Sequence, residues 1–261
     1  MTAFSPDRAA AALVAARHGA RQRLDRLPDG AHPATMAEGI AAQLVSATLQ
    51  SARAPAGFKI GATGKRMQDY LGLDTPAAGF MPESSLHGSG STIAIARFLH
   101  PGVECELAVH LAHDLPLGPC TPQQAATAVD RLMAGIEIVE NRYADLAVFG
   151  TPALIADQVF HAAAMLGEPF AAWRELDLRT LAGRITVDGA VRGEGVGGEL
   201  LGDPMQALAW LAGSAEAAAF GGLRAGQVVM LGSVTPPIWL DGPARIEVQF
   251  PPLPPVVLSL V

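Results

Sequence analysis

The chain has 261 residues, of which 50% are hydrophobic, and it carries a formal net charge of −7 at pH 7. This length and apolar content allow one large hydrophobic core or two small ones, and they exclude a mainly disordered chain. The negative charge argues against a protein that reads nucleic acid through its phosphates, and a charged content of only 16% suggests that partner subunits cover part of the surface.

Two helices are expected near the start of the chain. A Ser-Pro-Asp sequence is typical of a helix start and predicts a helix over Pro6–His18. A capping-box pattern predicts a second helix over Thr35–Ala52. We therefore expect a helical N-terminal unit over residues 1–55 and a β-rich catalytic domain over residues 56–261.

Short runs rich in β-branched residues, separated by glycine and proline, follow from residue 56. Asp188-Gly189 is a hairpin-turn pair. Strands do not alternate regularly with helices, so we expect an α+β fold with a mixed or antiparallel sheet. Helices are expected over residues 121–134, 153–166 and 204–220, and strands in the runs IAIARFL, VECELAVHL, IEIVE, RITVDGAVRG, QVVMLGSV and ARIEVQF.

Nothing in the sequence predicts export or membrane insertion. Cys105 and Cys120 have neither metal-binding nor disulfide-framework spacing, so we expect a reducing, cytoplasmic environment. No run approaches the ~20 apolar residues that span a bilayer. The alanine-rich N-terminal segment predicts a helix rather than a signal peptide.

Acidic residues alternate with apolar ones in the run VECELAVHL. The period of two in a strand places Glu104 and Glu106 on one face, roughly 7 Å apart at Cα. Two carboxylates placed in this way repel each other and need a cation, a shared proton or open water. One interpretation is a solvated sheet face, and the other is half of a divalent metal site.

Glu137 offers a third carboxylate. It lies between Ile136 and Ile138 in a run apolar enough to be buried, where an unpaired carboxylate is costly to ionise. Three carboxylates without a His/Cys cluster suit a hard ion such as Mg²⁺ or Mn²⁺. Glu140 is an alternative third ligand, and we favour Glu137 because of its apolar neighbours.

Lysine is rare in this chain. Of the 18 lysines and arginines, two are lysines, Lys59 and Lys65. Lys59 lies between Phe58 and Ile60, and a lysine can exchange a proton where an arginine cannot. The alternative is a lysine that extends to solvent. We expect Lys59 to have a depressed pKa and to act as an acid/base or to hold a carboxylate, and we interpret Lys65 as a surface charge.

Two further patterns carry little weight. The glycines of residues 193–198 satisfy GxGxxG, but they lie in a predicted hairpin, which argues against a dinucleotide site. Ser85 and Ser91 lack the GxSxG turn of an α/β-hydrolase nucleophile.

Six segments follow one another between Gly57 and Pro237: GFKIGATGKRMQDYLGLDTP, PGVECELAVHLAHDL, GIEIVENRYAD, LIADQVFHAAAMLG, GEGVGGELLGDPMQALAWLA and GLRAGQVVMLGSVTPP. This succession resembles the 2-keto-4-pentenoate hydratase family, within the fumarylacetoacetate hydrolase superfamily. That family includes 2-oxohept-3-enedioate hydratases and 4-oxalocrotonate decarboxylases. The resemblance implies a mixed β-roll or sandwich with peripheral helices and a helical N-terminal unit, assembled into a homo-oligomer.

The resemblance also implies roles for individual residues. The metal, Mg²⁺ or Mn²⁺, would be held by three carboxylates, those of Glu104, Glu106 and Glu137. Catalysis at the substrate would fall to Lys59. Substrate binding would fall to three polar residues, Asp157, Ser233 and Thr235.

The implied reaction adds water to a small 2-hydroxy- or 2-oxo-dienoic acid to give a 4-hydroxy-2-oxo acid, as in aromatic catabolism. Family hydratases usually carry Pro-Asp-aromatic-Gly where this chain has Pro76-Ala77-Ala78-Gly79. Because that Asp is a proposed acid/base, its replacement by Ala77 leaves alternatives open. These are a decarboxylase or C–C hydrolase with the same metal-dependent chemistry, or a non-catalytic binding or partner subunit.

Overall fold

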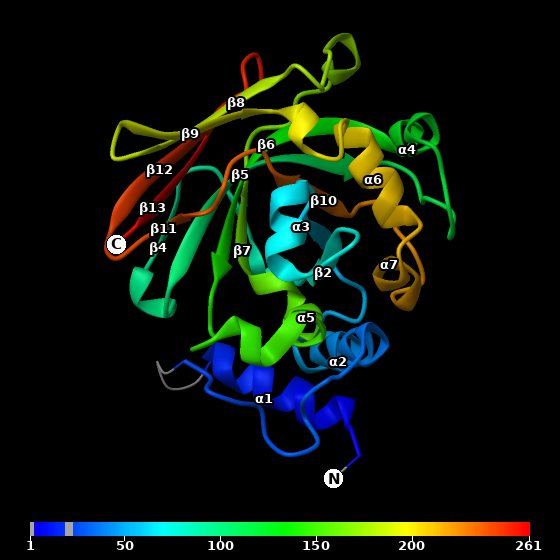
Figure 1. Cartoon of the computed structure of the whole chain (residues 1–261). Coiled ribbons are helices and arrows are strands. Elements are labelled where there is room, and N and C mark those ends of the chain that lie inside the picture. The colour runs from blue at the N-terminus through cyan, green and yellow to red at the C-terminus, as the bar shows by residue number, and fades with distance from the viewer. Residues whose placement is uncertain (1–2, 19–22) are drawn as a thin grey trace.

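Two β-sheets with helices around them make up the protein (Figure 1), in a computed structural model that describes residues 3–18 and 23–261. The helices are α1 (Pro6–His18), α2 (Met36–Leu49), α3 (Lys65–Leu71), α4 (Pro122–Ala128), α5 (Leu146–Ala156), α6 (Pro204–Ala212) and α7 (Ala215–Ala219). The strands are β1 (Gly57–Gly61), β2 (Ala77–Met81), β3 (Leu86–Gly88), β4 (Ser91–Ile93), β5 (Pro101–Leu111), β6 (Val129–Glu140), β7 (His161–Leu166), β8 (Ala182–Val187), β9 (Ala190–Val196), β10 (Val228–Ser233), β11 (Ile238–Trp239), β12 (Ala244–Gln249) and β13 (Val256–Leu260).

The larger sheet has the strand order β2-β1-β10-β5-β6-β7-β3, with β11 paired to β5, and the smaller sheet has the order β4-β13-β12-β8-β9. Both sheets mix parallel and antiparallel pairs: β1 and β10 are parallel, whereas the long strands β5 and β6 are antiparallel. The α+β class with mixed sheets and peripheral helices is therefore confirmed. No helix in the described ranges has the length and apolar character needed to cross a membrane.

The two faces of the larger sheet have different surroundings. Cys105 and Leu107 of β5 and Ile136 of β6 lie in the main hydrophobic core, together with side chains of β8, β12, β13 and α6. The alternate residues, Glu106 and Glu137, point to the opposite face. The period-two pattern in the sequence thus separates a face that stabilises the fold from a face that carries charge.

Helices cover the β2 edge of the larger sheet. The backbone of Ala78 in β2 turns its polar groups outward, where Gln43 of α2 donates to the carbonyl and Glu216 of α7 accepts from the N–H. Side-chain partners of this kind prevent an open sheet edge from pairing with another chain. Helices α1, α2 and α5 share a hydrophobic cluster at one end of the molecule (Figure 1), and the division at residue 55 stays a prediction.

The expected helix over residues 121–134 is too long. Helix α4 ends at Ala128, and β6 begins at Val129, where Leu132 and Ala134 pair with β5. The helix propensity of an alanine-rich segment amounts to a few tenths of a kcal/mol per residue. Pairing and burial in the centre of a sheet outweigh that preference.

The expected helix over residues 153–166 is also wrong in its second half. Helix α5 ends at Ala156, and residues 161–166 form β7, which pairs with β6. Between them, Gln158, Val159 and Phe160 have φ angles of 55°, 51° and 66°. These left-handed conformations cannot continue a right-handed helix, and they cost roughly 1–3 kcal/mol each.

Other expected elements differ at their ends. Helix α2 stops at Leu49 instead of Ala52, and the helix expected over residues 204–220 breaks at Gly213, where Ser214 caps α7. The run IAIARFL gives the end of β4 and a 3-10 turn rather than one strand. The helix at Pro6–His18, the strand in VECELAVHL and the hairpin at Asp188-Gly189 are confirmed.

Close packing of β2 against the left-handed turn at residues 158–160 makes Gly79 sensitive to substitution. A Cβ at this position would lie 2.4 Å from the carbonyl oxygen of Gln158, which is backbone and cannot rotate away. We expect Gly79→Ala to lower the free energy of unfolding by about 1–3 kcal/mol in urea titrations. Gly88→Ala is the matched control, because no atom lies within 4 Å of its added Cβ. Equal stability of the two variants would contradict this packing.

Candidate metal centre

Three glutamates gather on the charged face of the larger sheet. Glu104 and Glu106 come from β5, and Glu137 of β6 lies directly opposite Glu104 in the antiparallel register. One carboxylate oxygen from each residue lies within 4.8 Å of the other two. Alternation along one strand and register between two strands are therefore enough to bring three carboxylates to one point.

Two of the three glutamates are fully buried, Glu104 is partly buried, and the carboxylates are only partly satisfied. Glu106 and Glu137 have no exposed surface, and Oε2 of Glu106 accepts from the N–H of Gly232 at 2.9 Å. Oε1 of Glu106 has no hydrogen-bond partner among the described residues. A buried acceptor without a partner is costly, so this oxygen is a position where a ligand or ion could bind.

Burial and mutual repulsion shift the acidity of the cluster. Burial, with repulsion from Glu137, raises the pKa of Glu104 to about 7, although Lys59 opposes the shift. The same causes raise the pKa of Glu106 well above its usual range. Burial also acts to raise the pKa of Glu137, but the neighbouring Lys59 and His161 outweigh it and hold that pKa below its ordinary value. Glu137 is thus the carboxylate that stays ionised. The positive charge near Glu104 and Glu106 is too small to offset their burial and mutual repulsion.

These donors fit a hard divalent cation. All three offer oxygen, and no histidine or cysteine belongs to the group. Mg²⁺ and Mn²⁺ favour such oxygen ligands, and a dication would relieve the repulsion that raises the pKa values of Glu104 and Glu106. The unsatisfied oxygen of Glu106 is the observation in this structure that supports the fit.

Lys59 lies beside this cluster and does not extend to solvent. Its side chain is 2% exposed, its Nζ lies 3.1 Å from Oε2 of Glu137, and it donates to the carbonyl of Val159 at 3.0 Å. Burial lowers the pKa of this lysine, but the three carboxylates together outweigh burial and raise it. The expectation of a depressed pKa was therefore wrong for the metal-free protein, because several acids surround one ammonium group.

The left-handed turn at residues 158–160 contacts the ammonium group of Lys59, which also contacts Glu137. It directs the Val159 carbonyl to Nζ of the lysine. Gly61 and Gly79 give the turn room, since a Cβ on either would lie under 3 Å from Val159 or Gln158. Strain of this kind persists only where the surroundings enforce it, and it is concentrated at functional sites.

The structure places Asp157 in an ion-pair network. Arg17 lies 2.8 Å from its Oδ1, while Arg142 at 3.4 Å and the Tyr143 hydroxyl at 3.1 Å contact its Oδ2. Its side chain is 1% exposed. Both oxygens of Asp157 are therefore used by the protein itself, directly before the left-handed turn.

Ser233 and Thr235 lie where β10 meets β5. Ser233 is opposite Glu106 in the register, and its hydroxyl bonds to the backbone of Cys105 and Thr235. The hydroxyl of Thr235 is buried and has no partner within the described residues. The hydroxyl of Ser233 is thus used within the protein, and Thr235 follows β10 with its side chain against Gly193 of β9.

Sequence reasoning missed His161. Its Nδ1 lies 2.8 Å from Oε1 of Glu137, and its Nε2 lies 2.8 Å from the hydroxyl of Ser85. The ring is 1% exposed and fixes the orientation of the Glu137 carboxylate. The only signal was a single histidine in the small apolar run HAAAML, which the expected helix concealed.

Glu140, the alternative third ligand, lies outside the glutamate cluster, and Ala77 lies in an apolar environment. The carboxylate of Glu140 accepts from the N–H of Leu99 and pairs with Arg142 at 3.2 Å, away from the three-glutamate group. Ala77 is completely buried in an apolar cluster that includes Leu154 and Val159. The nearby acids Glu83 and Asp74 are exposed, and the buried carboxylate of Glu216 accepts from the N–H of the next residue, Ala78.

The chain matches known proteins over most of its length. The family model "Fumarylacetoacetate (FAA) hydrolase C-terminal" matches residues 49–258. A 2-keto-4-pentenoate hydratase of Burkholderia vietnamiensis is 35% identical over 182 residues, which cover 69% of this chain and 68% of the relative. A 2-hydroxyhexa-2,4-dienoate hydratase of Comamonas testosteroni is 31% identical over 183 residues, with coverage of 69% and 68%.

A solved structure shows the same fold. The 4-oxalocrotonate decarboxylase of Pseudomonas putida G7, complexed with magnesium and adipate, superposes with a TM-score of 0.88 over 100% of both chains at 24% identity. A structure of the same decarboxylase with calcium and acetate gives a TM-score of 0.85.

The shifted pKa of Glu104 gives a pH dependence that can be measured. Between its ordinary value of 4.5 and about 7, the folded protein binds more protons than the unfolded chain, so stability falls as pH rises through this window. We expect urea titrations in EDTA to show this decline, and Glu104→Gln to make it shallower. Glu194→Gln, an acid on β9 outside the cluster, is the control. An unchanged slope in Glu104→Gln would show that Glu104 is not destabilised by burial.

Proposed function

The chain belongs to the fumarylacetoacetate hydrolase superfamily, in the family of the 2-keto-4-pentenoate hydratases, and we propose that it is a divalent-metal-dependent hydratase. Its substrate would be a 2-hydroxy- or 2-oxo-dienoic acid, and its product a 4-hydroxy-2-oxo acid. The observation that carries the proposal is the convergence of Glu104, Glu106 and Glu137 beside a buried lysine. The hydratase relatives support the reaction type.

The three glutamates would hold Mg²⁺ or Mn²⁺. When bound, such an ion supplies a Lewis acid for the negative charge that develops on the 2-oxygen of the substrate, and its charge offsets the carboxylates that raise the pKa of Lys59. Glu137 has a second role, because it touches both the ammonium group of Lys59 and the ring of His161. Glu137 therefore contacts both the proposed metal position and the proposed proton donor, and fixes the distance between them.

Lys59 would transfer the proton. In the dienol, a proton leaves the 2-hydroxyl group and a proton arrives at C5, which converts the dienol into an unsaturated 2-oxo acid. Water then adds across the remaining double bond, with oxygen on C4 and hydrogen on C3. The buried ammonium group of Lys59, held between Glu137 and the Val159 carbonyl, is the acid positioned for the first of these steps.

Decarboxylation is the second candidate, and the surroundings of Ala77 favour it. Addition of water needs a group that handles the proton of that water, and the side chain of Ala77, which packs among apolar residues, is not such a group. Loss of CO₂ from a 2-oxo-enedioate breaks the carbon–carboxylate bond, and its electron pair enters the conjugated 2-oxo system. That step needs only the electron sink and a later proton from Lys59, so both reactions suit the same residues.

The hydratase proposal can be tested with 2-hydroxypenta-2,4-dienoate. We expect Mg²⁺-dependent loss of the dienol ultraviolet absorbance, and we expect Glu106→Gln to weaken Mg²⁺ binding and turnover by more than about 100-fold, since even residues behind metal ligands contribute about 10–100-fold. Glu194→Gln should behave as the wild type. No loss with this or longer dienoates despite Mg²⁺ binding would contradict a hydratase. Release of CO₂ from a 2-oxo-enedioate would then identify a decarboxylase, and inactivity on both would leave a binding subunit.

The role of Lys59 can be tested by the same substitution at each of the two lysines, with Lys65 as the control. Lys59→Arg keeps the positive charge but cannot release a proton near neutral pH, so we expect kcat to fall by about 10²–10⁴-fold while the affinity for Mg²⁺ stays within a few-fold. Lys65→Arg should retain full activity, because Lys65 is exposed and pairs with Asp69 on the same helix. An active Lys59→Arg enzyme would show that Lys59 serves as a fixed cation and not as a proton donor.

A further inference from the structure

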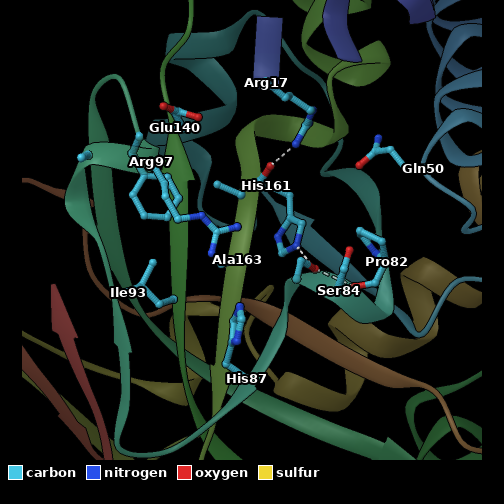
Figure 2. A pocket seen from close by; sticks show the side chains of 14 residues that line it. Arg17, Gln50, Pro82, Ser84, His87, Ile93, Arg97, Glu140, His161 and Ala163 are labelled. Carbon is cyan, nitrogen blue, oxygen red and sulfur yellow. Dashed lines mark hydrogen bonds between the residues drawn. The ribbon is translucent and has the colours of Figure 1, made fainter. Parts of the chain in front are cut away.

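A cavity of about 370 Å³ lies beside the start of β7, before the residues that pair with β3, and on the far side of the His161 ring from Glu137. Its walls come from the end of α1, the segment around β3, and the 3-10 turn at Ile95–Arg97. Figure 2 shows this space, with Arg97, His87 and His161 around it. None of the three clustered glutamates lines it, and neither does Lys59. The cavity is therefore a separate place in the molecule.

The charges in its wall are balanced except for one. Arg17 pairs with Asp157 and also donates to the carbonyl of His161. Glu140 pairs with Arg142. Arg97 is exposed, and no ion pair or hydrogen bond involves its side chain within the described structure. Its guanidinium points into the space between His87 and His161 (Figure 2). The cavity therefore has one uncompensated positive charge.

Groups of two kinds surround that charge. The hydroxyl of Ser84 and the half-buried ring of His87 can hydrogen-bond to a ligand, whereas the hydroxyl of Ser85 is already bonded to the Pro82 carbonyl and to His161. Apolar side chains, those of Ile93, Phe98 and Ala163, form another part of the wall. A guanidinium beside a hydroxyl and an apolar surface suits a carboxylate with a short hydrocarbon tail.

We propose that this cavity is a second binding site, which takes a small organic monocarboxylate with its carboxylate on Arg97 and its tail against Ile93 and Phe98. The single free cation matches one negative charge. A dianion such as phosphate or a dicarboxylate would bring a second negative charge that no free cation of the described wall balances. The proposal does not depend on the proposed hydratase activity, because it uses none of the clustered glutamates.

The test uses the full chain in EDTA, with butyrate as the probe because it lacks the 2-oxo group that would chelate a metal. Titrations followed by saturation-transfer NMR should give a Kd on the order of millimolar, as expected for so few atoms. Arg97→Gln should weaken binding by about tenfold or more, and Arg97→Lys by less. Arg97 lies on an exposed turn, so both variants should keep the fold. Arg192→Gln, an exposed arginine on β9 of the other sheet, is the matched control and should bind as the wild type.

Three results would overturn the proposal. Wild-type affinity in Arg97→Gln would show that Arg97 does not bind the carboxylate. Loss of butyrate binding in Glu106→Gln would place the ligand at the clustered glutamates. Tighter binding of inorganic phosphate or succinate than of butyrate would show that the site selects dianions. Unchanged affinity in Glu106→Gln supports a separate site, even if the protein fails to hydrate any dienoate.

Discussion

Repulsion among three carboxylates is the interaction on which the rest of the site depends. Glu104, Glu106 and Glu137 meet within 4.8 Å on one sheet face, and two of them have no exposed surface. One lysine and one histidine contact Glu137, which leaves the other two carboxylates with raised pKa values. Raised pKa values favour protonation of these two carboxylates in the metal-free protein, whereas a dication would replace the protons and bind Oε1 of Glu106, which has no partner among the described residues. Burial of these carboxylates lowers the stability of the metal-free fold, and the same carboxylates provide the ligands of the proposed metal site.

The fold supplies the rigidity that such a site needs. The opposite face of the same strands lies in the main hydrophobic core, so β5 and β6 cannot separate to relieve the repulsion. The left-handed turn at residues 158–160 adds strain of its own, and the ion pairs of Asp157 with Arg17 and Arg142 hold the chain where that turn begins. Packing and buried ion pairs thus enforce the position of the Val159 carbonyl on Lys59.

Much of this site could be predicted from local patterns. The alternation in VECELAVHL places Glu104 and Glu106 on one face, and the isoleucines beside Glu137 indicate its burial. The pairing of Glu137 with Glu104 depends on the register between strands, which local patterns do not specify. His161 was missed because HAAAML has the composition of a helix, and pairing with β6 overrides that preference. The sign of the Lys59 pKa shift depends on how many carboxylates surround it, which only the assembled sheet shows. The glycines of residues 193–198 have a packing role: added Cβ atoms at Gly195 and Gly197 would lie 2.0 Å from backbone oxygens.

The central claim is that the three carboxylates together hold one divalent ion. Anomalous diffraction from crystals soaked in Mn²⁺ tests it most directly, because the signal locates the ion without assuming any activity. One strong peak is expected in contact with oxygens of Glu104, Glu106 and Glu137, and it should be lost in Glu106→Gln crystals. A peak elsewhere, or none at saturating Mn²⁺, would contradict it.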